Sequence, residues 1–299
     1  MRVQAADATP VDHTPRPSPG VWIAAAAEIA VALGVATLML KSGDTGSAAE
    51  HDMPGMTGMP PSPSPQFGWQ PSLLIVAGCT AAVLIWWLAT RARVPAILAA
   101  AGLAFLGTSQ TVRVMALQSH LVAMAALEAL LVAVPLLLIA ALRRVQPTAG
   151  SGHSRPWTAG VIIAVVLNSG LLMALHLPAV HSHGADLDMV PLRLALLAVA
   201  IGLSYWAAII VTAGRVPPAL RRGALILGQE VAAILGLAAL LRPSRHLHHI
   251  NPLGLSPTMD QRLGGVLMLV TCAAVTLPLA KRLEQPKAAQ QLRTERNVH

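Results

Sequence analysis

The sequence is poor in charge and in the motifs of catalysis. Only 11% of its 299 residues are charged, whereas 55% are hydrophobic and the mean hydropathy is +0.61. This apolar share exceeds that of an ordinary soluble domain. We find no glycine-rich phosphate loop, nucleophile elbow, zinc-protease helix or pair of catalytic carboxylates in it. We therefore expect a membrane protein that is not an enzyme.

Cysteine is equally scarce. The two cysteines, Cys79 and Cys272, both lie inside apolar stretches and lack the spacing of a cysteine metal site. A buried metal thiolate would need a neighbouring group that favours the ionised form, whereas a neutral thiol packs as a small polarizable side chain. We interpret both as packing residues.

Long apolar stretches dominate the chain. A helix of about 20 apolar residues crosses a hydrocarbon core of roughly 30 Å, and the backbone of each span must satisfy its own hydrogen bonds. The stretches run approximately over residues 21–40, 72–90, 94–109, 114–142, 157–178, 190–214, 218–241 and 262–280. The sequence therefore predicts an all-α, polytopic membrane bundle of about eight transmembrane helices. Pro135 should kink the fourth of them, because proline lacks the amide proton that a helix needs.

The remaining segments divide the chain into three parts. We expect a flexible cytoplasmic tail over residues 1–20, a transmembrane domain over 21–281 and a basic cytoplasmic tail over 282–299. The loop 41–71, between the first two predicted spans, combines Gly, Ser, Pro and Met and lies on the outer side in this topology.

Positive charge sorts by membrane side. The formal net charge is +8, but the basic residues are not gathered into one face, so we expect no nucleic-acid partner. If the N-terminus is cytoplasmic, fifteen of the twenty-one Lys and Arg residues fall on the cytoplasmic side, as the positive-inside rule requires. We expect a multi-pass protein of the plasma membrane with both termini in the cytoplasm.

The outer loop carries the most informative run, His51-Asp-Met53-Pro-Gly-Met56-Thr-Gly-Met59. Thioether and imidazole donors without many carboxylates suit Cu(I) better than Zn(II), Ca(II) or Mg(II). We interpret His51, Met53, Met56 and Met59 as copper ligands. The alternative is a loop whose methionines have no such role.

Imidazole and thioether groups gather on the same predicted outer side. These residues are His51, His120, His176, His181, His183, His246, His248 and His249, with Met39, Met53, Met56, Met59, Met115, Met173, Met189 and Met259. If they served packing alone, the two ends of the bundle should share them more equally. We count His181 and His183 as further candidate ligands and leave the role of the three histidines at 246–249 open.

Polar groups also enter the predicted spans. His120, Met124 and Glu128 recur every four residues, which places them on one helical face. His120, Met124 and His176 can form a deeper copper station, and an ordinary hydrogen-bonded interior histidine is the alternative for His120. The carboxylates of Glu28, Glu128 and Glu230 can neutralise copper, relay protons or hold helices together.

Three segments resemble the CtaG-type cytochrome c oxidase assembly factors, a family of polytopic membrane proteins. They are Gln118-Ser-His120-Leu-Val-Ala-Met124, Leu175-His176-Leu-Pro178-Ala179 and Asp260-Gln261-Arg-Leu-Gly264-Gly265. The last is similar to the family's Asp-Gln-x-x-Gly-Gly motif at the start of its final span. Ala116 stands where the family usually has a second histidine.

The resemblance implies delivery of copper to an oxidase subunit. We therefore expect a protein that binds Cu(I) on the extracytoplasmic side, with the bilayer around it and a terminal oxidase subunit or a periplasmic copper protein as partner. Asp260 and Gln261 would orient the last helix. Two alternatives stay open, a copper transporter or copper-resistance permease, and a membrane scaffold with incidental metal binding.

Overall fold

The computed structural model describes residues 71–142, 155–176, 189–241 and 252–284, and every regular element in these ranges is a helix. The elements are α2 (Pro71–Thr90), α3 (Arg93–Thr108), α4 (Gln110–Gln118), α5 (His120–Glu128), the π-helical turn η1 (Ala129–Ala133), α6 (Val134–Leu142), α7 (Arg155–His176), α9 (Leu192–Ile210), α10 (Pro218–Leu241) and α11 (Pro257–Glu284).

The length and hydropathy of these helices suit a lipid bilayer. Six of them in the described ranges, counting α5, η1 and α6 as one, are long and apolar enough to cross a bilayer, and α3 with α4 makes a seventh if that bent pair is one span. Large apolar side chains such as Ile75, Phe105 and Leu196 are more than half exposed, which suits contact with lipid. The prediction of an all-α membrane bundle is confirmed, while its first span, residues 21–40, lies outside the described residues.

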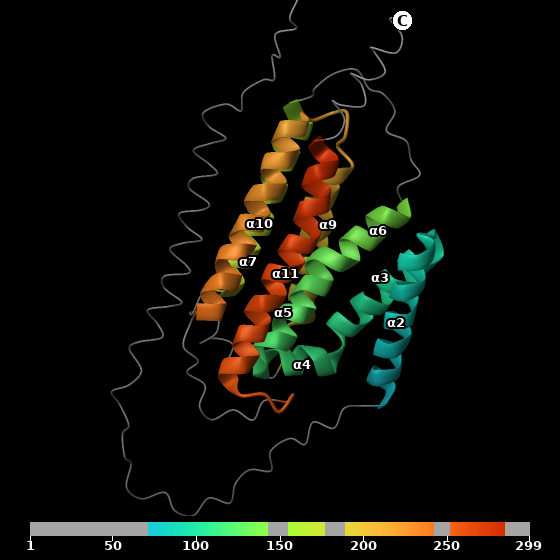
Figure 1. Cartoon of the computed structure of the whole chain (residues 1–299), viewed down its shortest axis with the longest axis vertical. Coiled ribbons are helices and arrows are strands. Elements are labelled where there is room, and N and C mark those ends of the chain that lie inside the picture. The colour runs from blue at the N-terminus through green and yellow to red at the C-terminus, as the bar shows by residue number, and fades with distance from the viewer. Residues whose placement is uncertain (1–70, 143–154, 177–188, 242–251, 285–299) are drawn as a thin grey trace, which may run out of the picture.

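Five spans pack in a ring (Figure 1). Helix α11 lies between α10 and α5, α10 also packs on α7, α7 on α9, and α9 on η1, which continues from α5. Helices α2 and α3 lie at one side of this ring, where α3 contacts α6. The largest buried cluster fills the ring and includes Tyr205, Trp206, Leu235 and Met268.

Successive spans run in opposite directions, so each end of the bundle holds the C-terminal ends of some helices and the N-terminal ends of others. At one end, which we call the His120 end, α4, α7 and α10 finish, and α2, α5 and α11 begin. At the other end, Arg221 of α10 donates from Nε to the carbonyl of Ile209 at 2.6 Å. A buried cation at the C-terminal end of α9 is favourable because the last carbonyls of a helix carry partial negative charge.

The prediction of a span over residues 114–142 is wrong at the N-terminal boundary. Ser119 has an extended backbone, so α4 stops at Gln118 and a new helix begins at His120. The Ser119 hydroxyl accepts a hydrogen bond from the amide of Val122 at 3.2 Å, which caps this new helix. Residues 114–118 therefore belong to α4, which is bent by 57° from α3.

Pro135 follows directly after a π-helical turn in the same span. In a regular α-helix, the carbonyl of Leu131 would accept from the amide of residue 135, which proline lacks. The Trp206 indole of α9 donates from Nε1 to this carbonyl at 3.1 Å instead. A Cβ at Gly202 would collide with the same carbonyl, so the glycine lets α9 approach closely.

We expect Trp206→Phe to lower the free energy of unfolding by about 1 to 2 kcal/mol, because the carbonyl of Leu131 loses the hydrogen bond from the indole. The apparent melting temperature of the purified protein in detergent measures this effect. Trp86→Phe is the control, since Trp86 is 49% exposed. Equal melting temperatures for the two variants would show that the indole contributes only apolar contact.

Candidate functional site

Asp260, in the first turn of α11, holds the start of α5. Its carboxylate accepts hydrogen bonds from the Ser119 hydroxyl at 2.6 Å, from the amide of His120 at 2.6 Å and from the amide of Leu121 at 3.3 Å. The first amides of a helix have no partner within the helix, and their partial positive charge favours an anion. Asp260 is only 5% exposed, so this cap joins two spans in a buried place.

Gly264, one turn further along α11, provides the space for the His120 ring. A Cβ at this position would lie 2.6 Å from Cδ2 of the imidazole and 3.3 Å from its Nε2. No side chain fits there unless the ring moves. Asp260 therefore fixes the backbone of His120, and Gly264 allows the position of its side chain.

Gln261 and Gly265 face the other neighbour of α11. The Gln261 amide donates from Nε2 to the carbonyl of Ala239 in α10 at 2.7 Å. A Cβ at Gly265 would lie 2.6 Å from the carbonyl oxygen of Gly236, so the two backbones meet at these glycines. The Asp-Gln-x-x-Gly-Gly motif thus contacts two neighbouring helices: Asp260 and Gly264 contact α5, whereas Gln261 and Gly265 contact α10.

His176 ends α7 and is 1% exposed. Its Nδ1 lies 2.8 Å from the carbonyl oxygen of Leu172. Because a carbonyl only accepts, Nδ1 carries the proton of the neutral ring, and the lone pair of the ring is on Nε2. In proteins, a carbonyl that accepts a hydrogen bond from one ring nitrogen commonly orients a histidine so that the other nitrogen can bind a metal.

Polar and sulfur side chains recur every four residues inward from His120 on α5 and from Gly264 on α11, and we call these residues the seam. The seam comprises His120, Met124 and Glu128 on α5, and Gly264, Met268 and Cys272 on α11. Of the α11 members, Gly264 faces α5, whereas Met268 lies against Gly236 of α10 and Cys272 lines a groove between α10 and α11. Each α11 member follows its α5 counterpart by 144 residues, so the two helices run parallel in one register. The Gly264 contact with His120 fixes this register at the His120 end.

Two soft donors inside the seam were not among the predicted ligands. Met268 is fully buried, and Cys272 and Met124 are each 7% exposed. The sequence pattern that could have revealed Met268 and Cys272 is their four-residue spacing on α11, which matches the spacing of His120, Met124 and Glu128 on α5. Ser119 was also missed, because a serine inside an apolar run gives no sign of a cap. The interpretation of Cys272 as a packing residue agrees with its place in the core cluster.

Arg113 supports the same end from α4. It donates from Nη1 to the carbonyl of Val190 at 2.9 Å and from Nε to that of Thr108 at 3.1 Å, and its own carbonyl accepts from the Val190 amide at 3.2 Å. These bonds join the bend between α3 and α4 to the segment that leads into α9. Arg113 therefore stabilises the packing of helices at the His120 end through hydrogen bonds.

The other predicted ligands fall outside the described residues. They are His51, Met53, Met56, Met59, His181 and His183, and the histidines at 246, 248 and 249 lie outside too. In the part of the chain that the structure describes, no three side chains of His, Cys, Asp or Glu converge as metal ligands. Among the predicted ligands, the structure describes His120, Met124 and His176. The four residues of the Asp-Gln-x-x-Gly-Gly motif, Asp260, Gln261, Gly264 and Gly265, each lie against a neighbouring helix.

Searches of protein-family models, of curated proteins and of solved structures give no match to this chain. The class of the protein therefore comes from its own fold. The described chain is a polytopic helical membrane protein whose His120 end is held together by Asp260, Gln261 and two glycines.

Proposed function

We propose that this protein binds Cu(I) at the His120 end and delivers it to a partner on the extracytoplasmic side, a terminal oxidase subunit during cytochrome c oxidase assembly. The observation that carries the proposal is the bonding of Asp260 to the first turn of α5, with Gly264 against the His120 ring. Two of the three segments that resemble the assembly factors thus contact each other, although 140 residues separate them.

In the chain order, the remaining candidate ligands adjoin helices that begin or end at the His120 end. Pro71, the first described residue after the methionine run, begins α2 at the His120 end. His181 and His183 follow soon after His176, which ends α7. Loop donors and helix donors are therefore connected to one end of the bundle.

The donor chemistry suits a cargo that must be released. Cu(I) prefers soft thioether and imidazole ligands, and flexible methionines can be replaced one at a time by the ligands of a receiver. In this proposal Met53, Met56, Met59 and His51 capture copper, whereas His120 and His176 hold it closer to the bilayer. Asp260 binds no metal and keeps His120 in place.

Replacing Met53, Met56 and Met59 together by leucine should reduce copper transfer to a copper-free oxidase subunit at least about tenfold, because leucine has no sulfur donor. Transfer is measured under reducing conditions from the copper content of the re-isolated subunit. Met259→Leu is the matched control, because Met259 lies on the first turn of α11 and is 49% exposed. Unchanged transfer by the triple variant would favour a scaffold with incidental metal binding.

A second candidate function is Cu(I) transport, and the seam is the observation that favours it. Met124 and Glu128 on α5, and Met268 and Cys272 on α11, stand at successive four-residue steps inward from the His120 end. A carboxylate in mid-membrane can compensate the charge of a monovalent cation. Copper accumulation in sealed vesicles that requires Glu128 would replace delivery by transport as the central role.

A further inference from the structure

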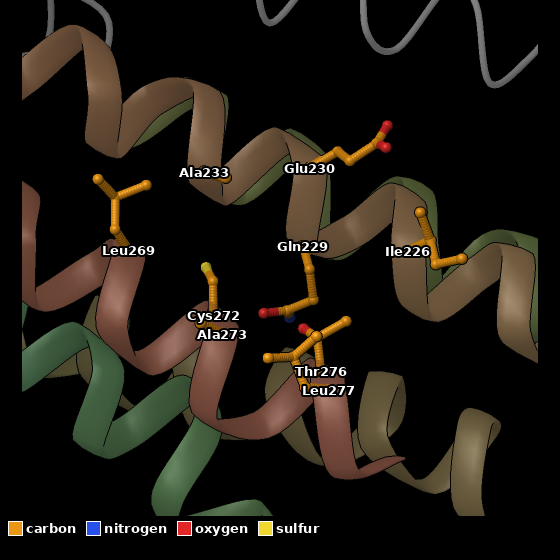
Figure 2. Close-up of a pocket in the computed structure, with 9 residues that line it drawn as sticks. All are labelled: Ile226, Gln229, Glu230, Ala233, Leu269, Cys272, Ala273, Thr276 and Leu277. Atoms are coloured by element: carbon orange, nitrogen blue, oxygen red, sulfur yellow. The ribbon is translucent and has the colours of Figure 1, made fainter. Parts of the chain in front are cut away.

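An open groove with a volume of about 290 Å³ lies between α10 and α11 (Figure 2). Most of its lining is apolar, but four polar residues line it: Gln229, Glu230, Cys272 and Thr276. The Gln229 side chain extends toward Thr276, and Glu230 stands at the rim and points away from α11. Glu230 is the thirteenth of the 24 residues of α10, so the groove lies in mid-membrane.

Three of these polar residues have no polar partner within the described part of the chain. Within the described ranges, the structure gives no hydrogen-bond or ion-pair partner to Gln229, Glu230 or Thr276, and the Thr276 hydroxyl oxygen is fully buried. Glu230 is an exposed residue. A carboxylate in contact with lipid is costly, so ionisable groups within spans normally face a polar partner. The groove therefore needs an occupant that compensates negative charge.

We propose that the groove is the docking site for a transmembrane helix of another protein that presents a lysine or arginine at mid-membrane. Such a helix would lie along α10 and α11, with its cation at Glu230 and its neighbouring polar atoms near Gln229 and Thr276. The proposal does not rest on copper delivery, since it uses neither the His120 end nor the methionine loop, and it shares only Cys272 with the seam.

The sequence of this chain does not supply the cation. In the described spans, lysine and arginine stand within about two turns of a helix end. The apolar stretch 21–40 carries a single ionisable residue, Glu28, which has the same sign as Glu230. A second copy in a two-fold dimer would place one Glu230 against the other, and like charges repel. The complementary charge therefore comes from a different protein.

The test uses the full chain in phosphatidylcholine vesicles and a synthetic apolar transmembrane peptide with one central lysine. A second peptide with leucine at that position is the comparison, and energy transfer between labelled protein and peptide measures binding. We expect the lysine peptide to bind at least about fivefold more tightly than the leucine peptide, as polar contacts between membrane helices allow. Glu230→Gln should abolish this preference.

Leu237→Ala is the matched control, because Leu237 is 48% exposed on the same helix and lies outside the groove. This variant should keep the preference for the lysine peptide. Equal binding of the two peptides to the wild-type protein, or a preference that survives Glu230→Gln, overturns the proposal. Self-association that depends on Glu230 and excludes the peptide also overturns it, because the occupant is then a second copy.

Discussion

Asp260→Ala is expected to lower the free energy of unfolding by about 3 to 4 kcal/mol, since each buried donor left without an acceptor costs about 1 to 3 kcal/mol. Three donors lose their acceptor in this variant: the Ser119 hydroxyl and the amides of His120 and Leu121. The negative charge that compensates the start of α5 disappears as well. The same change frees the backbone of His120, so copper retention should fall with stability.

The apparent melting temperature in detergent, followed by tryptophan fluorescence, measures this loss. Asp260→Asn should give an intermediate value, because its amide oxygen can still accept while its NH₂ group cannot. Arg262→Ala is the matched control, an exposed residue of the same helical turn. If Asp260→Ala melts at the temperature of Arg262→Ala, the bond between α11 and α5 contributes nothing to stability.

Gly265→Ala should destabilise the bundle by about 2 to 3 kcal/mol, since overpacking at a rigid contact forces the backbone to shift. The new Cβ would lie 2.6 Å from the carbonyl oxygen of Gly236 and 3.0 Å from the amide nitrogen of Leu240. Both atoms belong to the backbone of α10 and cannot rotate away. Helices α10 and α11 would therefore separate, and the Gln261 bond to Ala239 would lengthen.

Gly170→Ala provides the matched control for this substitution. Gly170 lies within α7, and a Cβ there would have no neighbour within 4 Å. Because alanine favours helix over glycine, we expect this variant to be neutral or stabilised by up to about 1 kcal/mol. Thermal unfolding of the two variants side by side tests the argument. A Gly265→Ala protein as stable as Gly170→Ala would contradict the close contact of α10 and α11.

Hydropathy alone predicted most of the fold. The span 218–241 agrees with α10 at both ends, and 190–214 contains all of α9. This agreement has a simple physical reason, since a long apolar stretch in lipid has no alternative to a helix that satisfies its own backbone. The four-residue step of His120, Met124 and Glu128 likewise placed them on one face.

The contacts that build the site could not be predicted in this way. Ser119 interrupts the predicted span 114–142, and its hydroxyl donates to Asp260, 141 residues away. In the π-helical turn before Pro135, the Leu131 carbonyl accepts a hydrogen bond from Trp206 of another span. Such partners are set by how the helices pack. The predicted ligands His51, Met53, Met56 and Met59 lie outside the described residues, so their role stays a prediction.

Copper content is the most direct test of the central claim. The full chain is purified under reducing conditions, and Cu(I) is titrated against a coloured chelator with and without the substitution of Met53, Met56 and Met59 by leucine. We predict that the wild-type protein binds Cu(I) and that the triple variant binds markedly less. Copper near zero in the wild-type protein would contradict the account.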